Sequence, residues 1–460
     1  MKGYGRGEKK VLLNLFCWLI KFKSLSSRLS VFGSSRRSPE FLFLLSPANT
    51  KKIAINGGRP VREKPLPVMH PGATFFDDAE VNAVLEVLKA QSPYRFYGPN
   101  FLNITGKFEE EFRSYVGSAH ALAVTSGTAA LHTALRGLGV GPGDEVIIPT
   151  YSWVACPSAV VATGATPVLA NVDESLTLDP KDVERRVTNR TRAIMAVHIR
   201  GVPCDLDRIA EIARRYGISL LEDVAQCGGG SYHGRKLGSI GDVGTFSFQL
   251  NKMISAGEGG AVVTNDQTTY ERCLMFHDTG TPYRGLEEKE LRYSIAPFPG
   301  LNYRANEISS AILRVQLKKM DAIIGRIREI KAKIKKGVSD LPGLEFRKIP
   351  DPEGEVAVGL VFFTESREKA VLFKEALMAE NIRTPSGSYP GVVYEPGRND
   401  GHVFMHWGHL LPGIERVSSQ YQQSLDLLGR AVHIDISPLD GDQEISDIVE
   451  GIRKVSNALL

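Results

Sequence analysis

Between residues 106 and 265 the sequence alternates short runs of strand-forming residues with longer segments of helical periodicity. Several of the runs are apolar without a break, which is typical of strands covered on both faces. Strands that alternate with helices predict an α/β fold with a mostly parallel sheet and helices on both sides. The predicted strands are Ala121–Thr125, Glu145–Pro149, Thr166–Ala170, Ala193–His198, Ser219–Asp223, Val243–Phe248 and Gly260–Thr264.

The flanking segments predict two further parts. A helix is expected over 78–90 behind the cap candidate Asp77, and a long helix over about 305–338. Beyond residue 340 the pattern becomes a separate α/β mixture. We therefore expect a basic, disordered extension at 1–52, a large domain with an N-terminal arm at 53–320, and a smaller α/β domain at 321–460. The elements expected in the smaller domain are a strand Ala357–Phe363, a helix Arg367–Glu380 and a last helix Asp442–Leu459.

The charge balance excludes a nucleic-acid footprint. Residues 1–50 hold nine Lys/Arg and two Asp/Glu, so the net charge of +4 leaves residues 51–460 at −3. The apolar stretch Val11–Ile20 is too short to span a bilayer and runs into Lys21 and Lys23, which favours a disordered extension or a misplaced start codon over a targeting segment. Five scattered cysteines without a CxxC pair fit a reducing cytoplasm, and neither a zinc site nor a disulfide framework.

Lys252 is the first candidate site residue. It lies between the predicted strands Val243–Phe248 and Gly260–Thr264, just before the glycine-rich turn 257–260. Burial in such a connection would lower the pKa of the amine and make it a usable nucleophile. A solvated surface lysine is the alternative for any single residue of this type.

Three other features follow strand ends. The segment 125–128 places Gly127 and Thr128 at a helix N-terminus, where free N–H groups and hydroxyls can hold a phosphate; a plain N-cap is the alternative. Asp223 closes a buried strand and needs a cationic partner, such as a protonated pyridine nitrogen, unless it caps the next turn. Trp153 could stack on a planar ring or belong to the core, and Ser247 could face the same phosphate as Gly127.

Together these features supply a phosphate cradle, a stacking ring, an acid for a ring nitrogen and an amine for an aldehyde. Pyridoxal 5′-phosphate is the common cofactor that needs all four. No GxGxxG follows a predicted strand and no GxxxxGK[ST] loop occurs, so a nicotinamide dehydrogenase is disfavoured. The sequence therefore predicts a pyridoxal-phosphate site at the carboxyl edge of the sheet.

The chain resembles the sugar aminotransferases of the DegT/DnrJ/EryC1/StrS family, which are fold-type I pyridoxal-phosphate enzymes, over about residues 53–455. The resemblance rests on six segments: Ser-Gly-Thr-Ala-Ala-Leu at 126–131, Gly-Asp-Glu-Val-Ile-Ile-Pro at 143–149, Glu-Asp-x-Ala-Gln at 222–226, Phe-Ser-Phe-x-x-x-Lys at 246–252, Gly-Glu-Gly-Gly at 257–260 and Gly-Leu-Asn-Tyr-Arg-Ala-Asn-Glu at 300–307.

The resemblance implies a role for each site residue. Lys252 would carry the cofactor as a Schiff base and move the proton, and Asp223 would hold the pyridine nitrogen protonated. Gln226 would contact the ring hydroxyl and Trp153 would stack on the ring. The phosphate would be held by Gly127, Thr128 and Ser247, and by Asn302 or Arg304 of a neighbouring subunit, which implies a homodimer with shared active sites.

The resemblance also implies a reaction class. Some relatives are dehydratases with histidine at the lysine position, so Lys252 favours amino transfer from glutamate or glutamine to a keto-sugar, a nucleotide-linked keto-sugar or a keto-cyclitol. A dehydratase and a non-catalytic regulatory protein on this fold are the alternatives. The motif Asn-Gly-Gly-x-Pro at 56–60 resembles members that act on cyclitols or on intermediates of aminoshikimate type. His406 and His409 could touch substrate hydroxyls.

Overall fold

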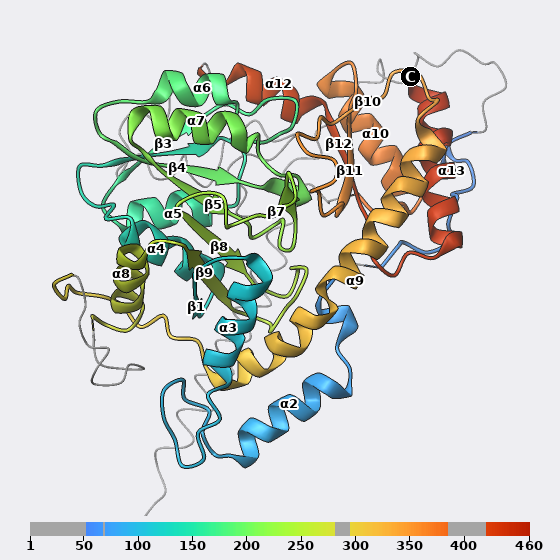
Figure 1. The fold of residues 1–460 in the computed structure, drawn as a ribbon. Coiled ribbons are helices and arrows are strands. Elements are labelled where there is room, and N and C mark those ends of the chain that lie inside the picture. Colours follow the sequence, from blue (N-terminus) through green and yellow to red (C-terminus); the bar gives the residue numbers. More distant parts are fainter. Residues whose placement is uncertain (1–51, 68–69, 281–294, 385–419) are drawn as a thin grey trace, which may run out of the picture. The chain divides into compact units, whose positions relative to one another are not determined.

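The computed structural model describes residues 52–67, 70–280, 295–384 and 420–460 (Figure 1). The chain divides into two compact units, Met1–Thr50 and Lys51–Leu460, and the described residues belong to the second. The predictions for residues 1–50, and those for His406 and His409, lie outside the described residues.

The larger sheet of the described part has seven strands in the order β1-β9-β8-β5-β4-β2-β3. Only β9 runs against its neighbours, so the other six strands share one direction and their carboxyl ends share one edge. This is the mostly parallel α/β sheet that the sequence predicts. Its strands are β1 His120–Val124, β2 Glu145–Pro149, β3 Thr166–Ala170, β4 Thr191–Val197, β5 Ser219–Asp223, β8 Val243–Ser247 and β9 Gly260–Thr264.

The apolar runs are explained by burial on both faces of this sheet. In β2, Ile147 packs into one core while Val146 and Ile148 pack into a second, and neither side meets solvent. Helices α3, α6, α7 and α9 contribute to the first core, and α4, α5 and α8 to the second. The bounds of the shorter helices are α3 Ile104–Val116, α4 Gly127–Gly137, α5 Ala155–Ala162, α6 Pro180–Arg186, α7 Leu206–Tyr216 and α8 Gln267–His277.

A second, antiparallel sheet of three strands lies in the C-terminal part (Figure 1). The predicted strand and helices correspond to β11 Gly359–Phe363, α10 Arg367–Ala379 and α13 Asp442–Leu459. Four short strands were not predicted individually, and neither was the helix that precedes the last strand. These are β6 Ser231–Tyr232, β7 Arg235–Lys236, β10 Glu345–Phe346, β12 Ala431–Asp435 and α12 Gln422–Arg430.

Helix α9, Glu307–Val338, is continuous past residue 320, and Figure 1 shows it running from the region of α2 to the three-stranded sheet. It packs on α2, α3 and α13. The domain boundary at 320 therefore falls inside one helix, and the division itself stays a prediction. Three short 3-10 helices complete the described elements: η2 Ala54–Asn56, η3 Ala73–Phe75 and η4 Ile199–Gly201.

Helix α2, Asp78–Lys89, begins with the predicted cap. The Asp77 carboxylate accepts from the Ala79 N–H at 2.8 Å, while the Glu80 carboxylate accepts from the Asp77 N–H at 3.0 Å, which is a capping box. The helix turns Glu80 and Val87 toward α9. Its most regular apolar stripe remains exposed, at 57%, 43% and 52% for Val81, Leu85 and Leu88.

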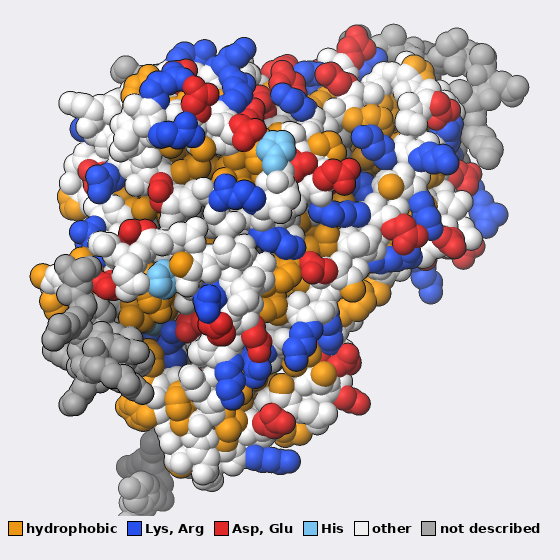
Figure 2. Space-filling view, viewed as in Figure 1, with side chains coloured by type: hydrophobic (Ala, Val, Ile, Leu, Met, Phe, Trp, Pro, Cys, Tyr) orange, Lys and Arg blue, Asp and Glu red, His pale blue; other side chains and the backbone are white. Residues whose placement is uncertain are grey.

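Charges are mixed on the surface. Figure 2 shows Lys/Arg and Asp/Glu side chains interspersed over the visible face, with no continuous basic stripe there. None of the helices within the described ranges combines the length and the apolar character needed to cross a membrane.

Candidate active site

Lys252 lies in the connection from β8 to β9, as predicted. The connection is closed by backbone hydrogen bonds from Phe248 N–H to Gly259 O at 2.8 Å and from Ala256 N–H to Phe248 O at 3.1 Å. The lysine is partly buried. Burial lowers its pKa, and the carboxylate of Asp223, the strongest of the opposing influences, raises it less. The amine is therefore easier to deprotonate than a surface lysine.

Asp223 ends β5 and is 5% exposed. Its Oδ1 accepts from the Ala225 N–H at 3.0 Å, and its Oδ2 accepts from the Sγ–H of Cys156 at 3.2 Å. Within the described residues it forms no ion pair with a Lys or Arg side chain. A buried carboxylate without a cation suits a cationic ring nitrogen, so this residue fits the predicted cofactor.

The phosphate cradle begins helix α4. Ser126 is the N-cap, and its Oγ accepts from the Ala129 N–H at 3.1 Å. Gly127 and Thr128 follow in the first turn, where N–H groups have no partner inside the helix. A Cβ on Gly127 would lie 2.7 Å from Cβ and 3.0 Å from Oγ of Ser247. The segment from β1 and the end of β8 therefore meet, and glycine is required because a side chain would fill the space between them.

Gln226 and Trp153 follow two other strand ends. The Oε1 of Gln226 accepts from the Arg200 N–H at 3.0 Å, which leaves its NH₂ group as the donor for a ring hydroxyl. Trp153 is 43% exposed, so it is not a core tryptophan. Its indole is available for stacking just before helix α5.

The two residues predicted to reach a neighbouring subunit differ in their surroundings. Arg304 forms an ion pair with Asp278 of its own chain, and its side chain is 16% exposed. Asn302 is exposed, and its Oδ1 accepts from the Arg304 N–H at 3.4 Å. Asn302 is therefore the better placed of the two to contact a second copy.

A buried network adjoins the site on the other face of β5. Both oxygens of Glu222 accept backbone N–H groups, from Ile240 and Gly241 on Oε1 and from Gly238 on Oε2. Nε2 of His198 lies 3.2 Å from Oε2. Neither Glu222 nor Cys156 was predicted as a site residue, although Glu222 lies in the segment 222–226 that carries the resemblance.

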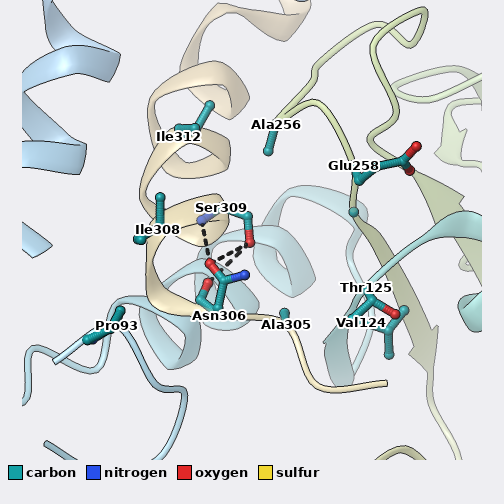
Figure 3. Close-up of a pocket in the computed structure, with 11 residues that line it drawn as sticks. Pro93, Val124, Thr125, Ala256, Glu258, Ala305, Asn306, Ile308, Ser309 and Ile312 are labelled. Atoms are coloured by element: carbon teal, nitrogen blue, oxygen red, sulfur yellow. Dashed lines mark hydrogen bonds between the residues drawn. The ribbon is translucent and has the colours of Figure 1, made fainter. Parts of the chain in front are cut away.

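A pocket of about 370 Å³ opens between the start of α9 and the connection that holds Lys252 (Figure 3). Its polar side chains come from Thr125, Glu258, Asn306 and Ser309, and Asn306 Oδ1 accepts from the Ser309 N–H at 2.9 Å. None of the described residues that line it is a Lys or Arg. Its electrostatics therefore suit hydroxyl groups better than a second phosphate.

Comparison with known proteins identifies the family. Residues 76–399 match the DegT/DnrJ/EryC1/StrS aminotransferase family, by a model of the whole family. The chain belongs to this family. The resemblance predicted from the segments between 126 and 307 is thus confirmed.

Individual members of the DegT/DnrJ/EryC1/StrS family align with much of the chain. GDP-perosamine synthase of Escherichia coli O157:H7 is 39% identical over 279 residues, which are 60% of this chain and 72% of the relative. L-Glutamine:2-deoxy-scyllo-inosose aminotransferase of Streptoalloteichus tenebrarius is 38% identical over 278 residues, which are 58% of this chain and 64% of the relative. The chain thus covers less than two thirds of some of its curated relatives.

The fold is shared with solved structures of the same kind. The crystal structure of S. venezuelae DesV in complex with a ketimine intermediate superposes with a TM-score of 0.72 and 31% identity, over 85% of this chain and 99% of that one. This agreement confirms the predicted α/β fold with a seven-stranded, mostly parallel sheet.

Proposed function

We propose that this chain is a pyridoxal-phosphate-dependent aminotransferase that moves an amino group from glutamate or glutamine to a keto-sugar, a nucleotide-linked keto-sugar or a keto-cyclitol. The observation that carries the proposal is the pair formed by Lys252 and Asp223. One is a partly buried amine of lowered pKa, and the other is a buried carboxylate that forms no ion pair with a Lys or Arg side chain of the described residues. Relatives named for transfer to sugars and to a cyclitol support the substrate classes.

When bound, the cofactor supplies an aldehyde for the amino group and a ring that withdraws electrons. The residues of the chain hold it and move protons. Asp223 would pair with the ring nitrogen and keep it protonated, and Lys252 would hold the cofactor through its amine and move a proton at the substrate carbon. Trp153 and Gln226 orient the ring through stacking and a donated hydrogen bond.

The phosphate belongs at the start of α4. Gly127 and Thr128 contribute N–H groups at the positive end of the helix dipole, and Ser247 adds a hydroxyl from the end of β8. A phosphate held there would place the cofactor next to the connection that holds Lys252, because Gly127 and Ser247 come together at the carboxyl edge of the sheet.

A spectroscopic titration tests this function. Purified full-length chain given pyridoxal 5′-phosphate should develop an absorbance band near the visible edge, which glutamate or glutamine should bleach. A panel of keto-sugars, nucleotide-linked keto-sugars and keto-inositols should restore the band when the right acceptor is present. Recovery of nitrogen in the product distinguishes amino transfer from dehydration. Wild-type protein that forms no band would refute the proposal.

Lys252→Ala should abolish both the band and turnover, while far-UV circular dichroism remains that of the wild type. The matched control is Lys107→Ala, which changes an exposed lysine on α3 and should leave both intact. Turnover by the Lys252→Ala chain at the level of this control would show that the lysine was assigned the wrong role.

We also propose a cytoplasmic homodimer with shared active sites. The exposed apolar stripe of Val81, Leu85 and Leu88 on α2 supports an association with a second copy. Mixing Lys252→Ala chains with Asn302→Ala chains tests the sharing. If each site uses the lysine of one chain and the asparagine of the other, every hybrid dimer has one intact site, and a randomly exchanged equimolar mixture regains about a quarter of wild-type activity. No recovery after verified exchange of subunits would exclude a shared site.

A further inference from the structure

A buried thiol contacts the carboxylate of Asp223, the group proposed to pair with the cofactor's ring nitrogen. Cys156 is the second residue of helix α5 and has no exposed surface. Its Sγ lies 3.2 Å from Oδ2 of Asp223, which is 67 residues away in the sequence. The other oxygen of Asp223 is held by the Ala225 N–H at 3.0 Å. Each oxygen therefore has one hydrogen-bond partner among the described residues, and these two contacts hold the carboxylate in place.

We propose that Cys156 is a positioning residue that sets the orientation of the Asp223 carboxylate for the cofactor's ring nitrogen. The proposal rests on the function proposed above and adds a residue to that site. Without the thiol, only Oδ1 keeps a hydrogen bond. The carboxylate can then rotate about χ2, a torsion with broad preferences in aspartate.

The chemistry of a thiol suits this task. The S–H group is a weak donor, so it fixes Oδ2 without neutralising the charge that must attract the ring nitrogen. A carboxylate has about four acceptor positions, and the two bonds seen here leave room for a further donor. Burial, followed by the charge of Asp223, raises the pKa of Cys156 well above its usual value, so the sulfur keeps its proton and donates.

The thiol also lies within the electrostatic surroundings of the lysine. The carboxylates of Asp223 and Glu258 raise the pKa of the Lys252 amine against the effect of burial. A change in the orientation of the Asp223 carboxylate would therefore alter the protonation of both the ring nitrogen and the lysine amine. This distinguishes a positioning role from plain packing, because a packing residue would alter stability without changing the charge state of the lysine–cofactor link.

The first experiment needs no cofactor. The S–H stretching band of Cys156 is isolated by infrared spectroscopy as the difference between wild type and Cys156→Ala. The reference is Cys273, an equally buried thiol whose Sγ contacts the Thr133 carbonyl at 3.5 Å. We expect the Cys156 band at lower frequency than the Cys273 band, and a shift to higher frequency in Asp223→Ala. A band that is insensitive to this change would overturn the proposal.

The second experiment measures cofactor binding and the pH midpoint of the absorbance band. Cys156→Ala should weaken binding about 5- to 10-fold and shift the midpoint, whereas Cys156→Ser, which keeps a donor, should stay within about 2-fold of wild type. Cys273→Ala is the matched control and should change neither. If wild type forms no band, the proposed function fails. If wild type and Cys273→Ala bind normally and Cys156→Ala equals them in both measurements, only the positioning role fails.

Discussion

Replacing Glu222 by glutamine should destabilise the chain strongly, although the change is nearly isosteric. The carboxylate is fully buried and has four hydrogen-bonding contacts. Oε1 accepts from the N–H groups of Ile240 at 2.8 Å and Gly241 at 2.7 Å. Oε2 accepts from the Gly238 N–H at 2.8 Å and lies 3.2 Å from His198 Nε2.

The magnitude follows from counting these contacts. An amide keeps one oxygen, so two of the four contacts are lost in either orientation and an NH₂ group then faces two donors. His198 cannot become an acceptor without further loss, because its Nδ1 already accepts from the Cys204 N–H at 3.0 Å. Hydrogen bonds to a charged group contribute about 1.5–3 kcal/mol each, so Glu222→Gln should lower the free energy of unfolding by about 3–6 kcal/mol.

The effect should depend on pH in a defined direction. Burial alone would raise the pKa of Glu222, but the hydrogen bonds from His198 and from the backbone of Gly238 and Gly241 outweigh it and hold the pKa below its usual value. A lowered folded-state pKa gives stability that is complete above the unfolded pKa of about 4.3 and is lost as the pH falls through the folded value. The difference in unfolding free energy between wild type and Glu222→Gln should therefore have its full value at pH 7 and become smaller below about pH 4.3.

Urea unfolding of the cofactor-free chain, followed by far-UV circular dichroism at one protein concentration, measures this difference at pH 7 and at lower pH. Glu365→Gln is the control, since that carboxylate is 77% exposed in an i,i+4 pair with Lys369. It should change the unfolding free energy by less than about 0.5 kcal/mol. If Glu222→Gln matched Glu365→Gln to within about 1 kcal/mol, the reasoning about the buried network would be refuted.

Three shorter predictions concern the cradle, the C-terminal region and the stacking ring. Gly127→Ala should weaken cofactor binding at least 10-fold in equilibrium dialysis with the fold retained, because its Cβ would press on Ser247 at 2.7 Å. Asp440→Asn should lower the unfolding free energy by about 3–5 kcal/mol in urea titrations, since it leaves the guanidinium of Arg383 buried without its carboxylate. In the same dialysis assay, Trp153→Phe should retain cofactor affinity and Trp153→Ala should lose it. Equal cofactor affinities of these two variants would exclude stacking.

The larger sheet could be predicted because burial on both faces leaves continuous apolar runs in the sequence. The predicted and observed strand ends differ by one or two residues. Phe248 was predicted in the strand but lies just outside β8, and His198 lies just outside β4. Strand β12 was missed because His433 and Asp435 interrupt its apolar pattern. These polar residues are tolerated for tertiary reasons, such as the ion pair of Asp435 with Arg200, which no local pattern reveals.

The site residues that could be predicted from the sequence are those that lie at or just after the end of a predicted strand. Lys252, Asp223 and Trp153 each come just after an apolar run, so the parallel sheet brings them to one edge. The contact of Cys156 with Asp223 could not be predicted, because it depends on where the start of helix α5 lies relative to the end of β5, and the two residues are 67 positions apart in the sequence. A cysteine in the first turn of a helix carries no signal of its own in the sequence.

Two adjacent carboxylates at the end of β5 have different electrostatic tasks, and strand geometry separates them. Side chains alternate between faces, so Glu222 shares a face with Leu220 and Val224, while Asp223 shares the other with Leu221, above the core that contains Cys156. Three backbone N–H groups and His198 compensate the charge of Glu222. Among the described residues, Asp223 accepts from one backbone N–H and from one weak thiol donor. Its charge is therefore less compensated than that of Glu222 and is available to a cation on the face where the cofactor is proposed to bind.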